Sequence, residues 1–161
     1  MNEIKKIKIT SESIKEIYLH ARKEFSYECC GWILGEKNST VASKVRKAKN
    51  QYSASTHPTK SSRSKETAYV ISGKDLIELN ESFEKTFVPK IIYHSHPNGK
   101  AYFSETDINN AMSPWGSEPS YPVQQVVIGI NKYEIVEAKQ FAWDYQSKKF
   151  IEINFLEGMK I

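Results

Sequence analysis

The sequence has only two cysteines among 161 residues, and they are neighbours, Cys29 and Cys30. Adjacent cysteines cannot easily reach unstrained disulfide geometry, so a disulfide-stapled secreted fold is excluded as the expected class. Long apolar runs are also absent, because stretches such as 126–130 are much shorter than the roughly 18 residues of a membrane-spanning helix. The first six residues lack the apolar core of a secretory signal. We therefore expect a cytoplasmic protein without a membrane partner.

A strong excess of one charge is missing as well. Lysine and arginine number 23 against 19 aspartate and glutamate residues, which gives a net charge of +4 without a run of like charges. This mild excess makes a nucleic-acid partner improbable. The length predicts one domain over 1–161, with exposed insertions near 51–65 and 113–122, where apolar periodicity is lost.

Apolar residues recur at helical spacing in three segments. The first helix is expected over 11–25. The second opens after Ser72 and places Leu76, Leu79, Phe83 and Phe87 on one face before Pro89 ends it. A short third helix is expected over 105–112.

Strand patterns fill the spaces between these helices. They are expected over the ranges 30–34, 40–47, 67–71, 90–96, 126–130, 133–143 and 150–155. Strands that alternate with helices in this way predict an α/β fold, in which helices cover a mixed sheet.

The residues best suited to bind a metal ion or to catalyse a reaction are concentrated in the stretch from His94 to Asp107. Residues two apart in a strand project to the same face, so His94 and His96 can converge on one point. Asp107 follows a turn and opens the next helix, from which its carboxylate can reach that point. Two imidazoles and one carboxylate are three protein ligands, the number that leaves a tetrahedral Zn²⁺ an open position for water. The pattern therefore predicts a catalytic zinc site.

Simpler interpretations of the same residues stay open. Histidines two apart are often only surface residues of an edge strand. Ser104 and Asp107 form Ser-x-x-Asp, a helix-capping signature that needs no catalysis. We expect both functions at once, since a cap that fixes the helix also fixes the carboxylate and the hydroxyl.

These residues resemble the JAMM (MPN-domain) zinc metallopeptidases, whose pattern is an upstream Glu, His-x-His-Pro and, with its Ser seven positions after the Pro, Ser-x-x-Asp. Every position matches. The resemblance implies that His94, His96 and Asp107 bind zinc, that Ser104 supports the tetrahedral intermediate, and that Glu28, before Cys29-Cys30-Gly31, is the upstream glutamate. It also implies a curved mixed sheet flanked by helices, similar to the cytidine deaminases.

The chemistry implied is amide or isopeptide hydrolysis without a covalent intermediate. A carboxylate beside a zinc-bound water, here Glu28, can take up its proton and pass it to the leaving amine. Cys29 and Cys30 are expected to pack rather than to attack, because free cysteine is usually buried.

Members of this family typically cleave after the C-terminal Gly-Gly of ubiquitin or a ubiquitin-like protein. The short insertions make the chain resemble the stand-alone prokaryotic forms, including enzymes that process ubiquitin-like sulfur carriers. Arg63, Lys65, Lys100, Tyr102 and Phe103 could receive the carrier's extended tail, although as loop residues they could equally be only solvated. A homodimer stays open.

Other functions are weighed against this one. A general deubiquitinase-like isopeptidase would remove modifiers from lysines, and the sequence does not separate it from a carrier-processing enzyme. A non-catalytic MPN scaffold is disfavoured because the motif is complete. A nucleic-acid-associated protein resembling the RadC group is disfavoured by the modest charge. A deaminase is disfavoured because no Pro-Cys-x-x-Cys pair is present.

Overall fold

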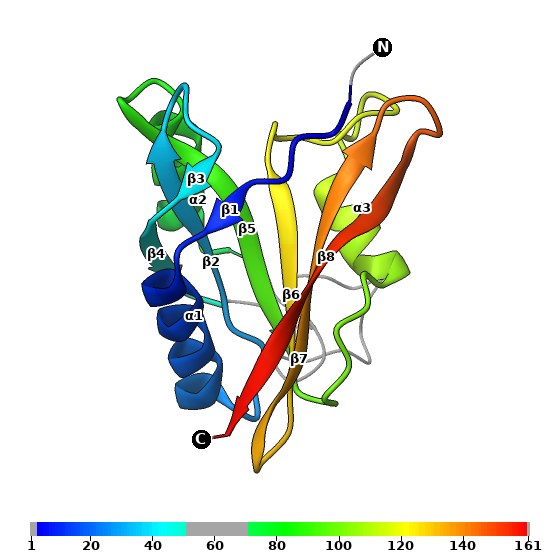
Figure 1. Cartoon of the computed structure of the whole chain (residues 1–161). Helices are drawn as coiled ribbons and strands as arrows, with labels where there is room; N and C mark the ends of the chain where they lie inside the picture. Colours follow the sequence, from blue (N-terminus) through cyan, green and yellow to red (C-terminus); the bar gives the residue numbers. More distant parts are fainter. Residues whose placement is uncertain (1–2, 51–70, 161) are drawn as a thin grey trace.

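A six-stranded mixed sheet forms the centre of the computed structural model, which describes residues 3–50 and 71–160 (Figure 1). The strands lie side by side in the order β4 (Lys44–Ala48), β2 (Cys30–Glu36), β5 (Phe87–His96), β6 (Gln124–Ile130), β7 (Glu134–Asp144) and β8 (Lys149–Lys160). Only the β5–β6 pair is parallel within this sheet. A separate parallel pair joins β1 (Lys8–Ile9) to β3 (Val41–Ala42). The predicted α/β class with a mixed sheet and helices is confirmed.

Each of the three helices found in residues 3–50 and 71–160 begins at a side-chain cap. Thr10, Ser72 and Ser104 cap α1 (Ser11–Glu24), α2 (Gly73–Ser82) and α3 (Glu105–Ala111) respectively, because each hydroxyl accepts an N–H of the first turn. The predicted helices are therefore present, with boundaries that differ by one or a few residues. None of the helices in the described part of the chain is long and apolar enough to cross a membrane.

Side chains of β5 alternate between the two faces of the sheet, and this alternation places the candidate site. Tyr93 belongs to the core cluster that packs against α1, together with fully buried Ile17. Ile92 belongs to the cluster on the opposite face, together with Leu79 of α2. His94, two residues beyond Ile92, therefore lies on the face away from α1.

The beginning of β5 differs from the prediction. Phe87 was expected on the helical face before Pro89, but it is the first residue of β5 and pairs with Glu36. Pro89 lies inside the strand, opposite Leu34 at a register shift, and the pairing with β6 begins only at Ile91. Proline is tolerated at this position because it stands at a register shift in the pairing with β2 and before the pairing with β6 begins.

Two further strand predictions need correction, and two other predictions fall mostly or wholly outside the described residues. The last strand runs to Lys160 rather than ending near 155, and the predicted strand 40–47 is interrupted at Ser43, whose N–H bonds the Leu34 carbonyl. The insertion near 51–65 and most of the strand expected over 67–71 lie outside the described residues. The segment 113–122 contains no helix or strand, although Met112 and Pro119 form an isolated bridge.

Stability below neutral pH is expected to depend on His20 of α1. Its Nδ1 lies 2.7 Å from the Tyr93 hydroxyl, and burial, helped by Lys47 and Lys23, lowers its pKa to about 4. In the unfolded chain the His20 imidazole is protonated below about pH 6.5, whereas in the folded protein it stays neutral down to about pH 4. The free energy of unfolding therefore falls as the pH drops from 6.5 to about 4. The full effect is on the order of 3 kcal/mol. Urea unfolding of wild type and His20→Gln at pH 7 and 4.5 tests this, and an equal pH dependence in both proteins would contradict it.

Candidate metal centre

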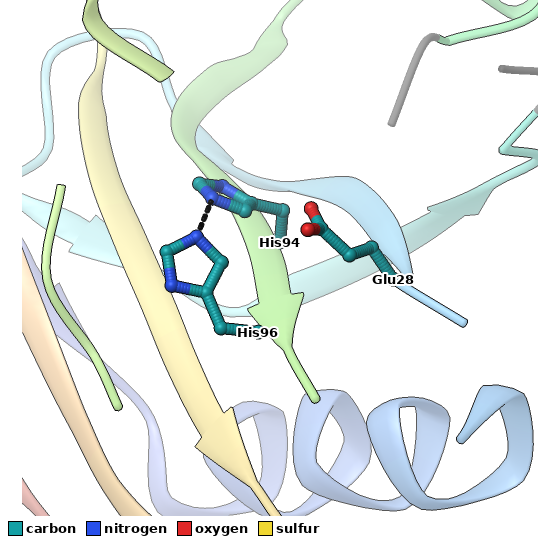
Figure 2. A group of neighbouring side chains, drawn as sticks. All are labelled: Glu28, His94 and His96. Carbon is teal, nitrogen blue, oxygen red and sulfur yellow. Dashed lines mark hydrogen bonds between the residues drawn. The ribbon is translucent and has the colours of Figure 1, made fainter. Parts of the chain in front are cut away.

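Three buried side chains from two elements meet at the end of β5. The His94 and His96 Nε2 atoms lie 3.2 Å apart, and the Asp107 Oδ2 of α3 lies 3.1 Å from the first and 3.0 Å from the second. Their exposed fractions are only 0%, 6% and 5%. Figure 2 shows that a nitrogen of each imidazole ring points toward the other ring. The two histidines predicted to converge do so, and Asp107 reaches the same point.

The spacing of these atoms fits a metal ion. Ligand atoms about 2.0–2.1 Å from a tetrahedral zinc lie roughly 3.3 Å from one another. The three distances observed are 3.0 to 3.2 Å. Imidazole nitrogen and carboxylate oxygen are ligands of zinc and related divalent metals. The donor set therefore suits such an ion.

The hydrogen bond on the far side of the His96 ring strengthens this interpretation. His96 Nδ1 lies 3.0 Å from the Lys100 carbonyl oxygen, which can only accept, so Nδ1 carries the hydrogen. In the neutral ring, Nε2 then presents a lone pair to the Asp107 carboxylate. Two electron-rich atoms at 3.0 Å repel each other, and a shared cation removes the repulsion.

The pKa values also favour the forms that bind metal. Burial lowers the pKa of His94, and Asp107 only partly offsets this, so the imidazole is neutral at neutral pH. Burial by itself would raise the pKa of Asp107, but the adjacent His94 and His96 outweigh it and hold that pKa well below its usual range. The centre therefore offers a neutral His94 imidazole and an ionised Asp107 carboxylate, the forms of these two residues that bind metal.

Glu28 approaches the same centre from the segment between α1 and β2. Its exposed fraction is 4%, and one carboxylate oxygen lies within 4.8 Å of ligand atoms of both His94 and His96. The carboxylate is directed toward His94 (Figure 2). This position suits either a proton acceptor beside a metal or a fourth ligand, since both need a carboxylate at short range.

Ser104 and Asp107 form a complete capping box at the start of α3. The Ser104 Oγ accepts the Asp107 N–H at 3.1 Å, and the Asp107 Oδ2 accepts the Ser104 N–H at 3.0 Å. The Asp107 oxygen that closes the cap is also the one that faces both histidines. The cap thus orients the carboxylate toward the centre.

The residues predicted to bind substrate are placed differently from one another. Half-exposed Tyr102 has its ring centroid 4.9 Å from that of His96, and Lys100 is exposed. Phe103 lies 6.4 Å from the His94 ring, but it also stacks on Phe141 and contacts Phe150 and so forms a wall of the centre. Arg63 and Lys65 lie outside the described residues.

The cysteines are unsuited to act as nucleophiles. Both are free and buried. Burial, the largest influence, raises the pKa of Cys29 to about 12 and that of Cys30 well above its ordinary value. A thiol needs its thiolate form to attack, so the packing role predicted for both residues agrees with their surroundings.

Two residues that support the centre were not predicted. The loop 97–103, whose Lys100 carbonyl orients His96, passes closely over Gly129 of β6. The same loop is held by Glu137 of β7, whose Oε2 accepts the Ala101 N–H at 3.0 Å. The sequence gives no signal for Glu137, whereas a glycine inside a predicted strand is a known sign of close backbone approach.

Gly129→Ala is expected to weaken metal binding. An added Cβ would lie 2.5 Å from the Gly99 carbonyl oxygen and 2.8 Å from the Lys100 nitrogen, so the loop must shift. Loss of the Lys100–His96 bond should reduce metal affinity about 10–100-fold, and the overpacking should cost about 1–3 kcal/mol. Chelator competition measures the affinity. Gly116→Ala, where an added Cβ meets nothing within 4 Å, is the control, and equal affinities would contradict the prediction.

Comparison with known proteins gives a family and a fold. A family described as prokaryotic homologs of the JAB domain matches residues 10–143. Solved structures of a Desulfitobacterium hafniense protein (16% identity, TM-score 0.62) and a Salinibacter ruber protein (17%, 0.60) share the fold. The first alignment covers 91% of this chain and 89% of the other, and the second covers 93% of this chain and 90% of the other. A JAB1/MPN domain protein from Archaeoglobus fulgidus is 14% identical with a TM-score of 0.51, and the alignment covers 93% of this chain and 96% of that one. No curated protein matches.

Proposed function

The chain belongs to the prokaryotic homologs of the JAB domain, and from this premise we propose that it is a zinc-dependent hydrolase. Its substrate would be the amide or isopeptide bond after the C-terminal Gly-Gly of a ubiquitin-like or sulfur-carrier protein. The observation that carries the proposal is the convergence of His94, His96 and Asp107 within 3.2 Å, with the Glu28 carboxylate beside them. Three protein ligands and a nearby carboxylate are the parts that metal-assisted hydrolysis needs.

Each side chain has a defined part in this proposal. His94, His96 and Asp107 would hold the ion, which when bound supplies Lewis-acid chemistry and lowers the pKa of water to about 7. Glu28 accepts the proton from the attacking water and delivers it to the leaving amine. The Ser104 Oγ already accepts the Asp107 N–H, so its own hydrogen can be donated to the oxyanion that develops on the substrate carbonyl.

The surroundings of the centre suit an extended tail. Half-exposed Tyr102 beside His96 offers an aromatic surface, and the adjacent Lys100 offers a positive charge. Glycines in such a tail let its backbone approach closely, which a mostly buried centre requires. We therefore assign Tyr102 and Lys100 to binding the tail, with Phe103 as the wall behind it.

A panel of defined substrates tests the proposal. Zinc-loaded protein is incubated with a carrier–cysteine adduct, a lysine-linked conjugate of the same carrier, and a carrier whose tail ends in Gly-Ala, and mass spectrometry identifies the products. We expect cleavage after Gly-Gly, suppression by a chelator, and preference for the cysteine adduct. Preference for the lysine conjugate would indicate a deubiquitinase-like isopeptidase. No cleavage of any substrate would contradict the proposal.

Variants of Ser104 should separate capping from catalysis. Alanine removes both the cap and the hydroxyl, whereas glycine at an N-cap costs only a few tenths of a kcal/mol. Both variants should lose about 10²–10³-fold in kcat if the hydroxyl donates to the oxyanion. Only Ser104→Ala should also lose about 0.5–2 kcal/mol of stability. Kinetics and thermal unfolding measure the two effects, and wild-type kcat in Ser104→Gly would remove the catalytic role.

A further inference from the structure

The peptide group between Glu28 and Cys29 is held by side chains instead of by the sheet. Strand β2 begins only at Cys30, so this group lies just outside the ladder. Its carbonyl, that of Glu28, accepts a hydrogen bond from Asn50 Nδ2 at 2.9 Å. Its N–H, that of Cys29, donates to Ser95 Oγ at 2.8 Å. Both polar atoms of one peptide plane are therefore bonded to buried side chains, which fixes the rotation of that plane.

Ser95 is the residue between the two histidines. It is fully buried, and because residues alternate along β5 its side chain projects to the face opposite His94 and His96. Its hydroxyl accepts the Cys29 N–H, and its own N–H donates to the Cys29 carbonyl at 3.1 Å. Ser95 thus separates the two histidines along β5 and is hydrogen-bonded to the residue that follows Glu28.

Asn50 is hydrogen-bonded to the same Glu28–Cys29 peptide group, but it comes from a different part of the sheet. It follows β4, is 9% exposed, and pairs with Ile71 in an isolated bridge. The neighbouring Ser72 N–H donates to the Lys49 carbonyl at 3.2 Å. These backbone bonds hold Asn50 where its amide reaches the Glu28 carbonyl. Two independent anchors, from β5 and from the end of β4, therefore act on one peptide plane.

We propose that Ser95 and Asn50 are positioning residues for the Glu28 carboxylate. The proposal rests on the proposed function, in which Glu28 moves a proton. The peptide plane that they hold is attached directly to the Glu28 α-carbon, so its rotation redirects the side chain. Because a carboxylate displaced by about 1 Å can lose 10²-fold in rate, a fixed plane has a direct catalytic effect.

Matched variants separate the hydrogen bond from the packing. Ser95→Thr and Ser95→Val have nearly the same shape, but only threonine keeps the hydroxyl. Asn50→Asp keeps the shape but turns a carboxylate oxygen toward the Glu28 carbonyl. Ser95→Val should lose about 10–100-fold in kcat relative to Ser95→Thr, and Asn50→Asp should lose a similar factor relative to wild type. KM and the amount of bound zinc should stay unchanged in both variants. The probe is a peptide ending in Gly-Gly joined to aminomethylcoumarin.

A control variant removes a similar bond elsewhere. The Ser39 hydroxyl accepts the Val41 N–H at 3.0 Å, away from the centre, so Ser39→Ala should keep full turnover. Amide hydrogen exchange at Cys29 provides a measurement without substrate. That amide should exchange faster in Ser95→Val than in Ser95→Thr. Equal protection in both would overturn the inference.

Coupling to Glu28 distinguishes positioning from a merely structural role. In a Glu28→Gln background, Ser95→Val should cause no further loss of kcat, because the group that it positions has already been disabled. An equal loss in both backgrounds, or no loss in either, would overturn the inference while leaving the proposed function intact. Full activity of Glu28→Gln itself, or no cleavage of the probe by wild type, would instead overturn the proposed function.

Discussion

Glu28→Gln is expected to abolish nearly all turnover while the metal stays bound. Glutamine keeps the size of the side chain but can neither accept a proton from water nor return it to a leaving amine. General acid–base catalysis contributes about 10²–10⁴-fold, and we expect kcat to fall by that factor. Kinetics with a Gly-Gly substrate and metal analysis of the same preparation measure the two quantities together.

The control for this variant is Glu36→Gln. Glu36 is the exposed last residue of β2, the strand that follows Glu28, so the same change of charge is made in nearby sequence but away from the centre. It should retain wild-type kcat. Undiminished turnover in Glu28→Gln would remove the general-base assignment. Loss of the metal from Glu28→Gln would show instead that Glu28 is a ligand, as its position within 4.8 Å of the histidine nitrogens permits.

His94→Asn and His96→Asn are each expected to lose the metal and, with it, all activity. Each removes an imidazole nitrogen that lies 3.0 to 3.2 Å from the other donor atoms. Outer-shell partners alone are worth about 10–100-fold in metal affinity, so loss of a ligand should cost more than about 100-fold. Metal content after dialysis against a weak chelator, with circular dichroism to verify folding, measures the effect.

His20→Gln is the matched control for these two variants. His20 is also a buried histidine, but it bonds Tyr93 on the face of the sheet that packs against α1. It should therefore retain the metal even if it unfolds at a lower temperature. Full metal content in His96→Asn, or metal loss in His20→Gln, would contradict the assignment of the centre.

The histidine pair was predictable because strand alternation is a local property. His94 and His96 needed only a strand between Pro89 and Pro97, and Asp107 needed only a helix that opens at Ser104. The beginning of β5 was not predictable in the same way. Proline usually interrupts a strand, and only the register shift opposite Leu34 together with the late start of β6 pairing makes Pro89 acceptable.

The supporting residues show where sequence patterns stop being informative. Alternation indicates that Ser95 faces away from the two histidines, but not that it meets the Cys29 N–H, which is 66 positions away in the chain. Asn50 bonds the Glu28 carbonyl and Glu137 bonds the Ala101 N–H only because the strand order brings β4, β5 and β7 into place around the centre. That order depends on how the whole sheet packs, which no short stretch of the sequence encodes.

A crystal structure of the zinc-loaded protein, with anomalous data collected at the zinc absorption edge, would show whether the three side chains bind the ion. We expect one ion per chain, bound by His94, His96 and Asp107, with solvent in the remaining position and the Glu28 carboxylate beside that solvent. An ion closed off by a fourth protein atom, or no ion at these three side chains, would contradict this expectation.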